Sequence, residues 1–97
     1  MEELVDLQCI YDSRQSFYGK AKVETKEYKT RKSKAISLLS YGTLVAMINE
    51  YEHKKTYHYF GKYSQTTTRH QKEFFKQNGL SDKEIKELFD KGILEVR

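Results

Sequence analysis

The sequence predicts one α+β domain, residues 1–97, in which a small antiparallel β-sheet meander precedes two short consecutive helices. Apolar and polar residues alternate through the first two-thirds of the chain, which is the pattern of half-buried strands. In the last third the spacing becomes helical, and two stretches carry capping residues before them and a glycine after them. Strands grouped ahead of helices, instead of alternating with them, are typical of α+β domains.

Two strands are predicted on either side of a polar break at residues 12–16. Residues 5–11 form the first strand, and the side chains that share one face are Val5, Leu7, Cys9 and Tyr11. Residues 17–24 form the second strand, and its inward face comprises Phe17, Gly19, Ala21 and Val23. The lysine-rich residues 26–34 are expected to be a loop or a hairpin tip.

The apolar stretch at residues 35–51 is too long for a single strand. Residues 40–42 are expected to bend it, to form a bulge, or to precede a short helix that starts at Thr43. A turn at residues 51–55 then leads into a further strand. This strand spans residues 56–63 and places three tyrosines on one face: Tyr57, Tyr59 and Tyr63.

Local signals predict the limits of the first helix. It is expected to begin with a capping box at residues 68–71, in which Thr68 accepts from the Gln71 amide and the Gln71 side chain reaches back. It is expected to end at Gly79, which can adopt the left-handed conformation. Leu80 is then placed to contact Phe75, as in a Schellman motif.

The second helix has equally clear limits in the sequence. Residues 81–84 form a second capping box, and Leu80 and Ile85 have the spacing of a hydrophobic staple. Gly92 is expected to end this helix, and residues 93–97 are expected to form a short final strand.

Composition limits the class of protein. The chain is 37% hydrophobic and 33% charged, which suffices for one modest core. The single Cys9 cannot form an internal disulfide, so a reducing compartment is expected. No apolar run reaches the roughly 18 residues of a membrane span, and the acidic N-terminal residues do not resemble a signal peptide. We therefore expect a soluble, intracellular protein without a membrane partner.

Positive charge is concentrated in residues 20–34. The chain has a net charge of +4, and the excess of basic over acidic residues lies in this segment. Its lysines and arginine outnumber its acidic residues, which are Glu24 and Glu27. Such a segment can bind a polyanion or an acidic protein face, and interleaved tyrosines can stack on bases or form protein interfaces. A merely solvated hairpin tip is the alternative. The candidate binding residues are Lys26, Lys29, Arg31, Lys32, Lys34, Tyr57, Tyr59 and Tyr63.

Residues 66–70 form a second candidate site, because three threonines, Arg69 and His70 come together at a predicted helix start. Thr67 and His70 could approach each other as nucleophile and base, but no carboxylate nearby would orient the histidine. Free amides at a helix start beside Arg69 could instead bind a phosphate or carboxylate. The simplest interpretation is a helix cap with His70 on a turn. Arg69 and His70 are kept as partner-binding candidates.

Metal and cofactor sites are not predicted. The histidines and Cys9 do not have the spacing of metal ligands, and the glycines are isolated, so no phosphate-binding loop is expected. We therefore expect no cofactor and no enzymatic activity.

Two short motifs are familiar. They are Ser-Tyr-x-Thr at residues 40–43 and Tyr-Ser-x-Thr-Thr-x-Arg-His at residues 63–70, within a similarity that covers roughly residues 11–79. The chain resembles a family of small uncharacterised proteins carried by bacteriophages and related mobile elements. The resemblance implies an accessory phage gene expressed in a bacterial cytoplasm, and it supplies no catalytic residues.

The expected function is therefore that of a non-enzymatic binding protein. Because small accessory phage proteins commonly block host machines, the leading hypothesis is inhibition or modulation of a host nucleic-acid-handling or defence protein. Its sharpest form is an anti-CRISPR-like action on a nucleic-acid-guided nuclease. The alternative is direct binding of DNA or RNA through residues 20–34 and exposed tyrosines. A third hypothesis is an enzyme centred on Arg69 and His70. The sequence leaves the target and the oligomeric state open.

Overall fold

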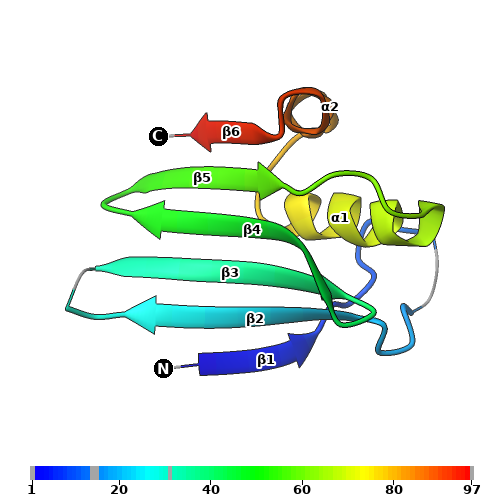
Figure 1. Cartoon of the computed structure of the whole chain (residues 1–97), viewed down its shortest axis with the longest axis horizontal. Helices are drawn as coiled ribbons and strands as arrows, with labels where there is room; N and C mark the ends of the chain where they lie inside the picture. Colours follow the sequence, from blue (N-terminus) through cyan, green and yellow to red (C-terminus); the bar gives the residue numbers. More distant parts are fainter. Residues whose placement is uncertain (1, 14–15, 31, 97) are drawn as a thin grey trace.

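The computed structural model describes residues 2–13, 16–30 and 32–96. It confirms the α+β class: an antiparallel meander precedes two helices, and one more strand completes the sheet (Figure 1). The strands are β1 (Glu2–Asp6), β2 (Ala21–Tyr28), β3 (Ser33–Ser40), β4 (Thr43–Tyr51), β5 (Lys54–Tyr59) and β6 (Ile93–Val96). The helices are α1 (Gln65–Gln77) and α2 (Asp82–Lys91).

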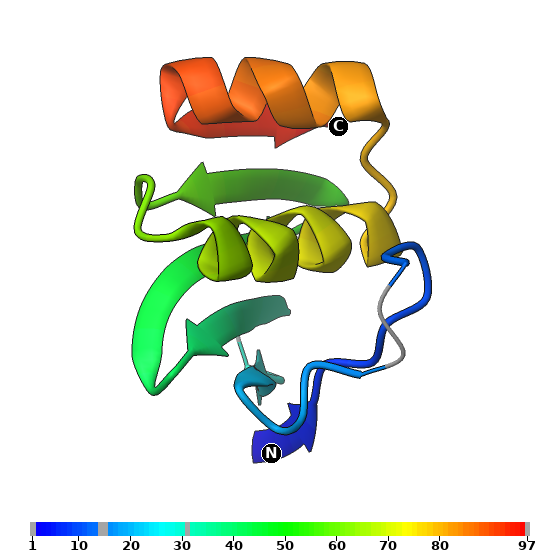
Figure 2. The same cartoon turned by 90° about the vertical axis from the view of Figure 1, so that its right-hand side faces the viewer.

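All strands pair antiparallel in the order β1-β2-β3-β4-β5-β6, so each strand lies beside its neighbour in sequence. Both helices pack on one face of the sheet, with α1 against β3 and β4 and α2 beside β5 and β6 (Figure 2). The opposite face is not covered by any described part of the chain. The two ends of the chain lie at opposite edges of the sheet (Figure 1).

The core lies between the helices and the sheet. The register places Ile48 opposite Tyr57, and both side chains are buried on the face that the helices cover. Phe74 and Phe75 of α1 and Leu88 of α2 close this core from the other side. Each such fully buried side chain contributes about 1.5–3 kcal/mol, so this contact stabilises the packing of both helices on the sheet.

The break predicted near residues 40–42 is a tight turn followed by a bulge. Tyr41 and Gly42 form a two-residue turn between β3 and β4, and no helix starts at Thr43. The register then shifts by one residue: Leu39 pairs with Leu44, whereas Leu38 pairs with Ala46. The extra residue is Val45, which is 1% exposed. The bulge thus turns one additional side chain into the core.

The N-terminal strands differ from their predicted limits. The first strand ends at Asp6, after which residues 7–13 leave the sheet, and Tyr11 is exposed instead of sharing a buried face. The second strand starts only at Ala21, because Phe17 and Gly19 belong to a turn. At its other end β2 continues to Tyr28 and β3 starts at Ser33, so most of the predicted lysine-rich loop belongs to these two strands.

The predicted start of the first helix is wrong by one turn. Ser64 is the N-cap, and its hydroxyl accepts a hydrogen bond from the Thr67 amide at 3.1 Å. Thr68 lies within the helix, where its hydroxyl donates to the Ser64 carbonyl at 3.0 Å. Gln71, the expected partner in the capping box, points into the core. Ser64 and Thr68 are both favourable N-cap residues by type, and tertiary contacts make Ser64 the N-cap.

The other helix ends are confirmed. Leu80 N–H donates to the Phe75 carbonyl at 3.1 Å, and Gly79 N–H donates to the Lys76 carbonyl at 3.1 Å, which is the Schellman pattern. Gly79 has φ +95°, a conformation that favours glycine.

Helix α2 also has its predicted limits. Ser81 and Glu84 form a reciprocal capping box, and Gly92 ends the helix with φ 82°. Within the described residues, neither helix is long and apolar enough to cross a membrane.

We expect Gly79→Val to destabilise the domain by about 1–2 kcal/mol, because it forces a β-branched residue into the left-handed region. A Cβ atom at this position would meet nothing within 4 Å, so the cost is conformational and not a clash. Gly79→Asn should cost less, since asparagine tolerates this region. Urea unfolding of both variants shows which of them loses more stability. Equal stability of Gly79→Val and the wild type would contradict the helix ending at Gly79.

We also expect Tyr57→Phe to lower stability by about 0.5–1.5 kcal/mol, because the Tyr57 hydroxyl donates to the Asn78 carbonyl at 2.9 Å. Burial, with smaller effects from Glu84 and Glu50, raises the Tyr57 pKa above its ordinary value of 10.0. The folded state favours the neutral phenol. Its contribution to the free energy of unfolding is therefore fully present below pH 10.0 and is lost as pH rises through the raised pKa.

Urea unfolding from about pH 9 to about pH 11 measures this effect, because the interval spans the titration of tyrosine. The wild type should lose stability more steeply with pH than Tyr57→Phe. Parallel curves for the two proteins would show that the buried phenol does not titrate with unfolding. Tyr59, whose pKa burial also raises, remains in both proteins and provides the common background.

Candidate functional site

The segments that carry the two motifs meet at the first half of α1. Ser40 Oγ lies 2.8 Å from His70 Nδ1 and 3.0 Å from Thr67 Oγ1. The Phe17 ring packs edge-on against the His70 ring, with centroids 4.5 Å apart, and the Tyr41 ring lies 5.9 Å from it. Residues far apart in sequence therefore converge on one buried histidine.

His70, which the sequence placed on a turn and kept as a partner-binding candidate, is a buried residue of α1. His70 is 1% exposed and Thr67 is 4% exposed. Both side chains bond to the Ser40 hydroxyl, so the polar atoms of the suggested nucleophile and base are used in packing α1 on β3. Among the described residues, no group of three or more His, Cys, Asp or Glu side chains could hold a metal ion.

A buried carboxylate on the same helix holds the segment that follows β1. Glu73 is 2% exposed, and its Oε1 accepts hydrogen bonds from the backbone amides of Tyr11 at 2.9 Å and Asp12 at 2.7 Å. Its Oε2 accepts from Gln77 Nε2 at 2.6 Å, and this amide also donates to the Gln8 carbonyl at 2.6 Å. No local sequence signal indicates a contact across more than 60 residues, so sequence reasoning missed it.

Arg69 lies at the surface but is paired within the molecule. Its Nη1 is 3.3 Å from Asp12 Oδ1, and the two side chains are 45% and 11% exposed. Arg69, Lys72 and Lys76 follow one face of α1 and line a cavity of about 330 Å³ together with Tyr11 and Asp12. The expected anion site at the helix start is therefore weakened, because the arginine already contacts a carboxylate.

The predicted basic segment lies among carboxylates. The register places Lys34 between Glu27 and Glu50, and Lys26 Nζ lies 3.7 Å from Glu24 Oε1. The tip lysines Lys29 and Lys32 are exposed, and Arg31 lies outside the described residues. Because acidic side chains of β2 and β4 alternate with these lysines, the segment is less positive in space than in sequence.

The three predicted tyrosines do not form one exposed face. Tyr57 is 2% exposed and Tyr59 is half-buried, with its ring stacked 4.2 Å from the Phe89 ring. Only Tyr63, in the loop before α1, is exposed, at 54%. The alternation correctly placed Tyr57 and Tyr59 on the same face. That face is the one covered by the helices, so Tyr57 is a core residue in this structure and not a surface contact.

The two most unusual tyrosines are not among the candidate residues chosen from the sequence. Tyr18 is 77% exposed and Tyr41 is 58% exposed, and both have positive φ, 53° and 51°. Each precedes a glycine that also has positive φ, so both pairs occupy tight turns of the kind that favours Asn-Gly. The repeated Tyr-Gly pair between alternating segments is a sequence signal that could have revealed these turns.

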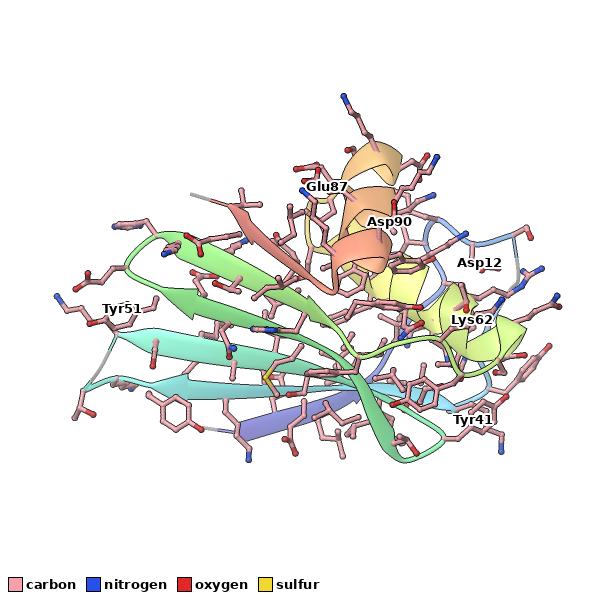
Figure 3. All side chains as sticks on the ribbon, turned by 45° about the horizontal axis from the view of Figure 1, so that its top comes forward. Asp12, Tyr41, Tyr51, Lys62, Glu87 and Asp90 are labelled. Atoms are coloured by element: carbon pink, nitrogen blue, oxygen red, sulfur yellow. The ribbon has the colours of Figure 1, made fainter. Side chains whose placement is uncertain are left out.

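Three of the exposed tyrosines, Tyr18, Tyr41 and Tyr63, lie at one end of the molecule. The Tyr41 amide donates to the Lys20 carbonyl at 2.8 Å, which joins the two Tyr-Gly turns, and Tyr63 precedes the α1 cap whose hydroxyl contacts Thr67. Figure 3 shows Tyr41 and Lys62 at this end and Tyr51 at the other. We call this surface the tyrosine end; its members are Tyr18, Lys20, Tyr41, Lys62 and Tyr63.

Residues 5–91 match the family of unknown function DUF8033. The chain belongs to this family. The match contains the tyrosine end, the His70 contacts and the Glu73 contacts, and it confirms the expected relation to an uncharacterised family. No curated protein and no solved structure matches the chain. Membership in DUF8033 assigns no activity, so the function has to be argued from the surface.

We expect His70→Ala to destabilise this DUF8033 domain by about 2–4 kcal/mol, since it leaves a cavity and removes a partner of Ser40. Arg69→Ala should cost at most about 1 kcal/mol, because its ion pair is half-exposed. Urea unfolding of the two variants measures the difference. A smaller loss for His70→Ala than for Arg69→Ala would contradict the scaffold role of His70.

Proposed function

We propose that this DUF8033 chain is a non-catalytic binding protein that docks on a partner protein through the tyrosine end. The observation that carries the proposal is the backbone conformation of Tyr18 and Tyr41. Positive φ costs a bulky residue about 1–2 kcal/mol, and asparagine or glycine would avoid most of that cost. Strained residues of this kind cluster at functional sites.

The chemistry of the exposed side chains supports a protein partner. Tyr18, Tyr41 and Tyr63 are each more than half exposed, and tyrosine is enriched among residues that dominate protein interfaces. Lys20 and Lys62 are exposed beside them and have no ion-pair partner among the described residues. The partner surface that this end fits is therefore acidic and accepts aromatic side chains.

The biological setting we propose follows from the resemblance to phage and mobile-element proteins. In this setting the chain is an accessory protein of the bacterial cytoplasm that inhibits or modulates a host nucleic-acid-handling or defence protein. An anti-CRISPR-like action on a nucleic-acid-guided nuclease is the most specific form of the proposal.

Direct nucleic-acid binding through the lysine hairpin is the second candidate. Lys29 and Lys32 are exposed at the tip, which favours contact with phosphates. Glu27 and Glu50 flank Lys34 in neighbouring strands and oppose such contact. For this reason a protein partner ranks first. We do not propose an enzyme centred on Arg69 and His70, because Arg69 is paired with Asp12 and His70 is engaged in the core.

The proposal predicts that Tyr18→Asn/Tyr41→Asn separates binding from stability. Asparagine tolerates positive φ, so the melting temperature should stay equal or rise, while binding of the partner is lost. Glu52→Asn is the matched control: Glu52 has φ 48° in the turn at the opposite end, so it gains the same conformational relief. This control should retain the partner.

The measurement is capture of bacterial lysate proteins on the immobilised chain, with and without nuclease, next to binding of a labelled oligonucleotide at several salt concentrations. We expect one partner to survive nuclease and to be lost only in the tyrosine variant. Oligonucleotide binding that falls steeply with salt and is lost in Lys29→Gln/Lys32→Gln would support the second candidate instead. Full retention of the partner by the tyrosine variant would contradict docking through this end.

A further inference from the structure

The sheet face opposite the helices has an uncharged centre. Because Ile48 and Tyr57 face the helices, the residues beside them in each strand face the other way. The two middle strands, β3 and β4, contribute only neutral side chains to this face. They are Ser33, Ala35, Ser37, Leu39, Leu44, Met47, Asn49 and Tyr51.

The charges on this face lie in the outer strands and are paired with one another. Among the described side chains there are three lysines and three carboxylates, and they form three ion pairs. The pairs are Lys22–Asp6 at 3.0 Å, Lys26–Glu24 at 3.7 Å and Lys54–Glu95 at 2.6 Å. The described side chains of the open face therefore carry no net charge, which distinguishes it from the basic tyrosine end.

Large apolar side chains of the open face remain accessible. Leu44 is 39% exposed and Tyr51 is 53% exposed near the two ends of β4, while Leu4 and Ile93 on the two edge strands are 57% and 51% exposed. An uncharged centre with accessible apolar side chains, flanked by paired charged residues, is a composition that protein interfaces share. A nucleic acid is disfavoured, because this face offers no excess of positive charge to phosphates.

We propose that this face packs against the same face of a second copy, so that the protein is a symmetric dimer. In a twofold dimer the interface has to complement itself. Strands β3 and β4 are the middle pair of the six strands. A twofold axis that lies between the two sheets, parallel to both, and passes over this pair therefore places the neutral centre of one copy on that of the other. The outer strands then meet with charges of both signs, and they do not repel.

The face is large enough for such an interface. Six strands about 4.8 Å apart and about seven residues long at ~3.3 Å each cover roughly 700 Å² in projection. A stable interface takes about 800 Å² of accessible surface from each partner, and the relief of the side chains adds to the projected area. Two twisted sheets then stack about 10 Å apart, as in a β-sandwich.

This dimer goes beyond the proposed function and does not depend on it. The tyrosine end lies at the ends of the strands, beside the first turn of α1, whereas the open face lies on the side away from both helices (Figures 2 and 3). Dimerisation through the sheets therefore leaves the tyrosine end accessible and presents two copies of it in one particle.

Sedimentation equilibrium of the full chain over a range up to the order of 100 µM, a concentration that populates even a weak interface, tests the proposal. We expect the mass to rise from 11.6 kDa to twice that value as concentration increases. Leu44→Glu should weaken association about 100-fold or more, because each dimer would bury two unpaired charges. Leu44 is already 39% exposed in one copy, so this variant should keep its fold, which circular dichroism verifies.

Ile10→Glu is the matched control, since Ile10 is 65% exposed in the segment after β1 and lies off the open face. It should dimerise like the wild type. Met47→Glu, a change in the middle of β4, should repeat the effect of Leu44→Glu. A chain that remains at 11.6 kDa throughout overturns the proposal. So does a dimer that Leu44→Glu and Met47→Glu leave intact, because the contact would then lie elsewhere.

Discussion

The docking of α1 on the sheet depends on buried polar side chains as much as on its two phenylalanines. Thr67, His70, Gln71 and Glu73 are each at most 4% exposed. Leaving a buried donor or acceptor without a partner costs about 1–3 kcal/mol, so any shift of the helix along the sheet would break several hydrogen bonds at once. Apolar contacts alone tolerate such a shift. These hydrogen bonds give α1 a single position, and the tyrosine end inherits its geometry from that position.

Two of these side chains, Gln71 and Glu73, bond to irregular parts of the chain. Gln71 Nε2 donates to the carbonyls of Val45 at 3.0 Å and Gly61 at 3.1 Å, so one amide holds both the bulge in β4 and the loop before α1. Glu73 does the same for the amides of residues 11 and 12. Irregular backbone has no ladder to satisfy its polar groups, and here the helix supplies the missing partners.

The sequence predicted what short-range chemistry determines. The helix ends at Gly79 and Gly92 follow from glycine conformation and capping within a few residues, and they are correct. The start of α1 and the role of Gln71 could not be read in this way, because two capping signals compete and tertiary contacts, such as those of Gln71 with Val45 and Gly61, decide between them. The burial of Tyr57 likewise depends on which face of the sheet the helices cover. Alternation fixes which residues share a face and leaves open which face is buried.

The arrangement of contacts along the chain also has a consequence for folding kinetics. Strands β2 to β5 are joined by tight hairpins, so they can pair in succession with little loop-closure entropy. Segment 8–12 is bound by Glu73 and Gln77 over sequence separations of 61 to 69 residues, and it belongs to no ladder. We therefore expect this segment to lock last and to open first, as a separate unit of low local stability. Because the chain contains no proline, no slow isomerisation phase should obscure that late step in refolding.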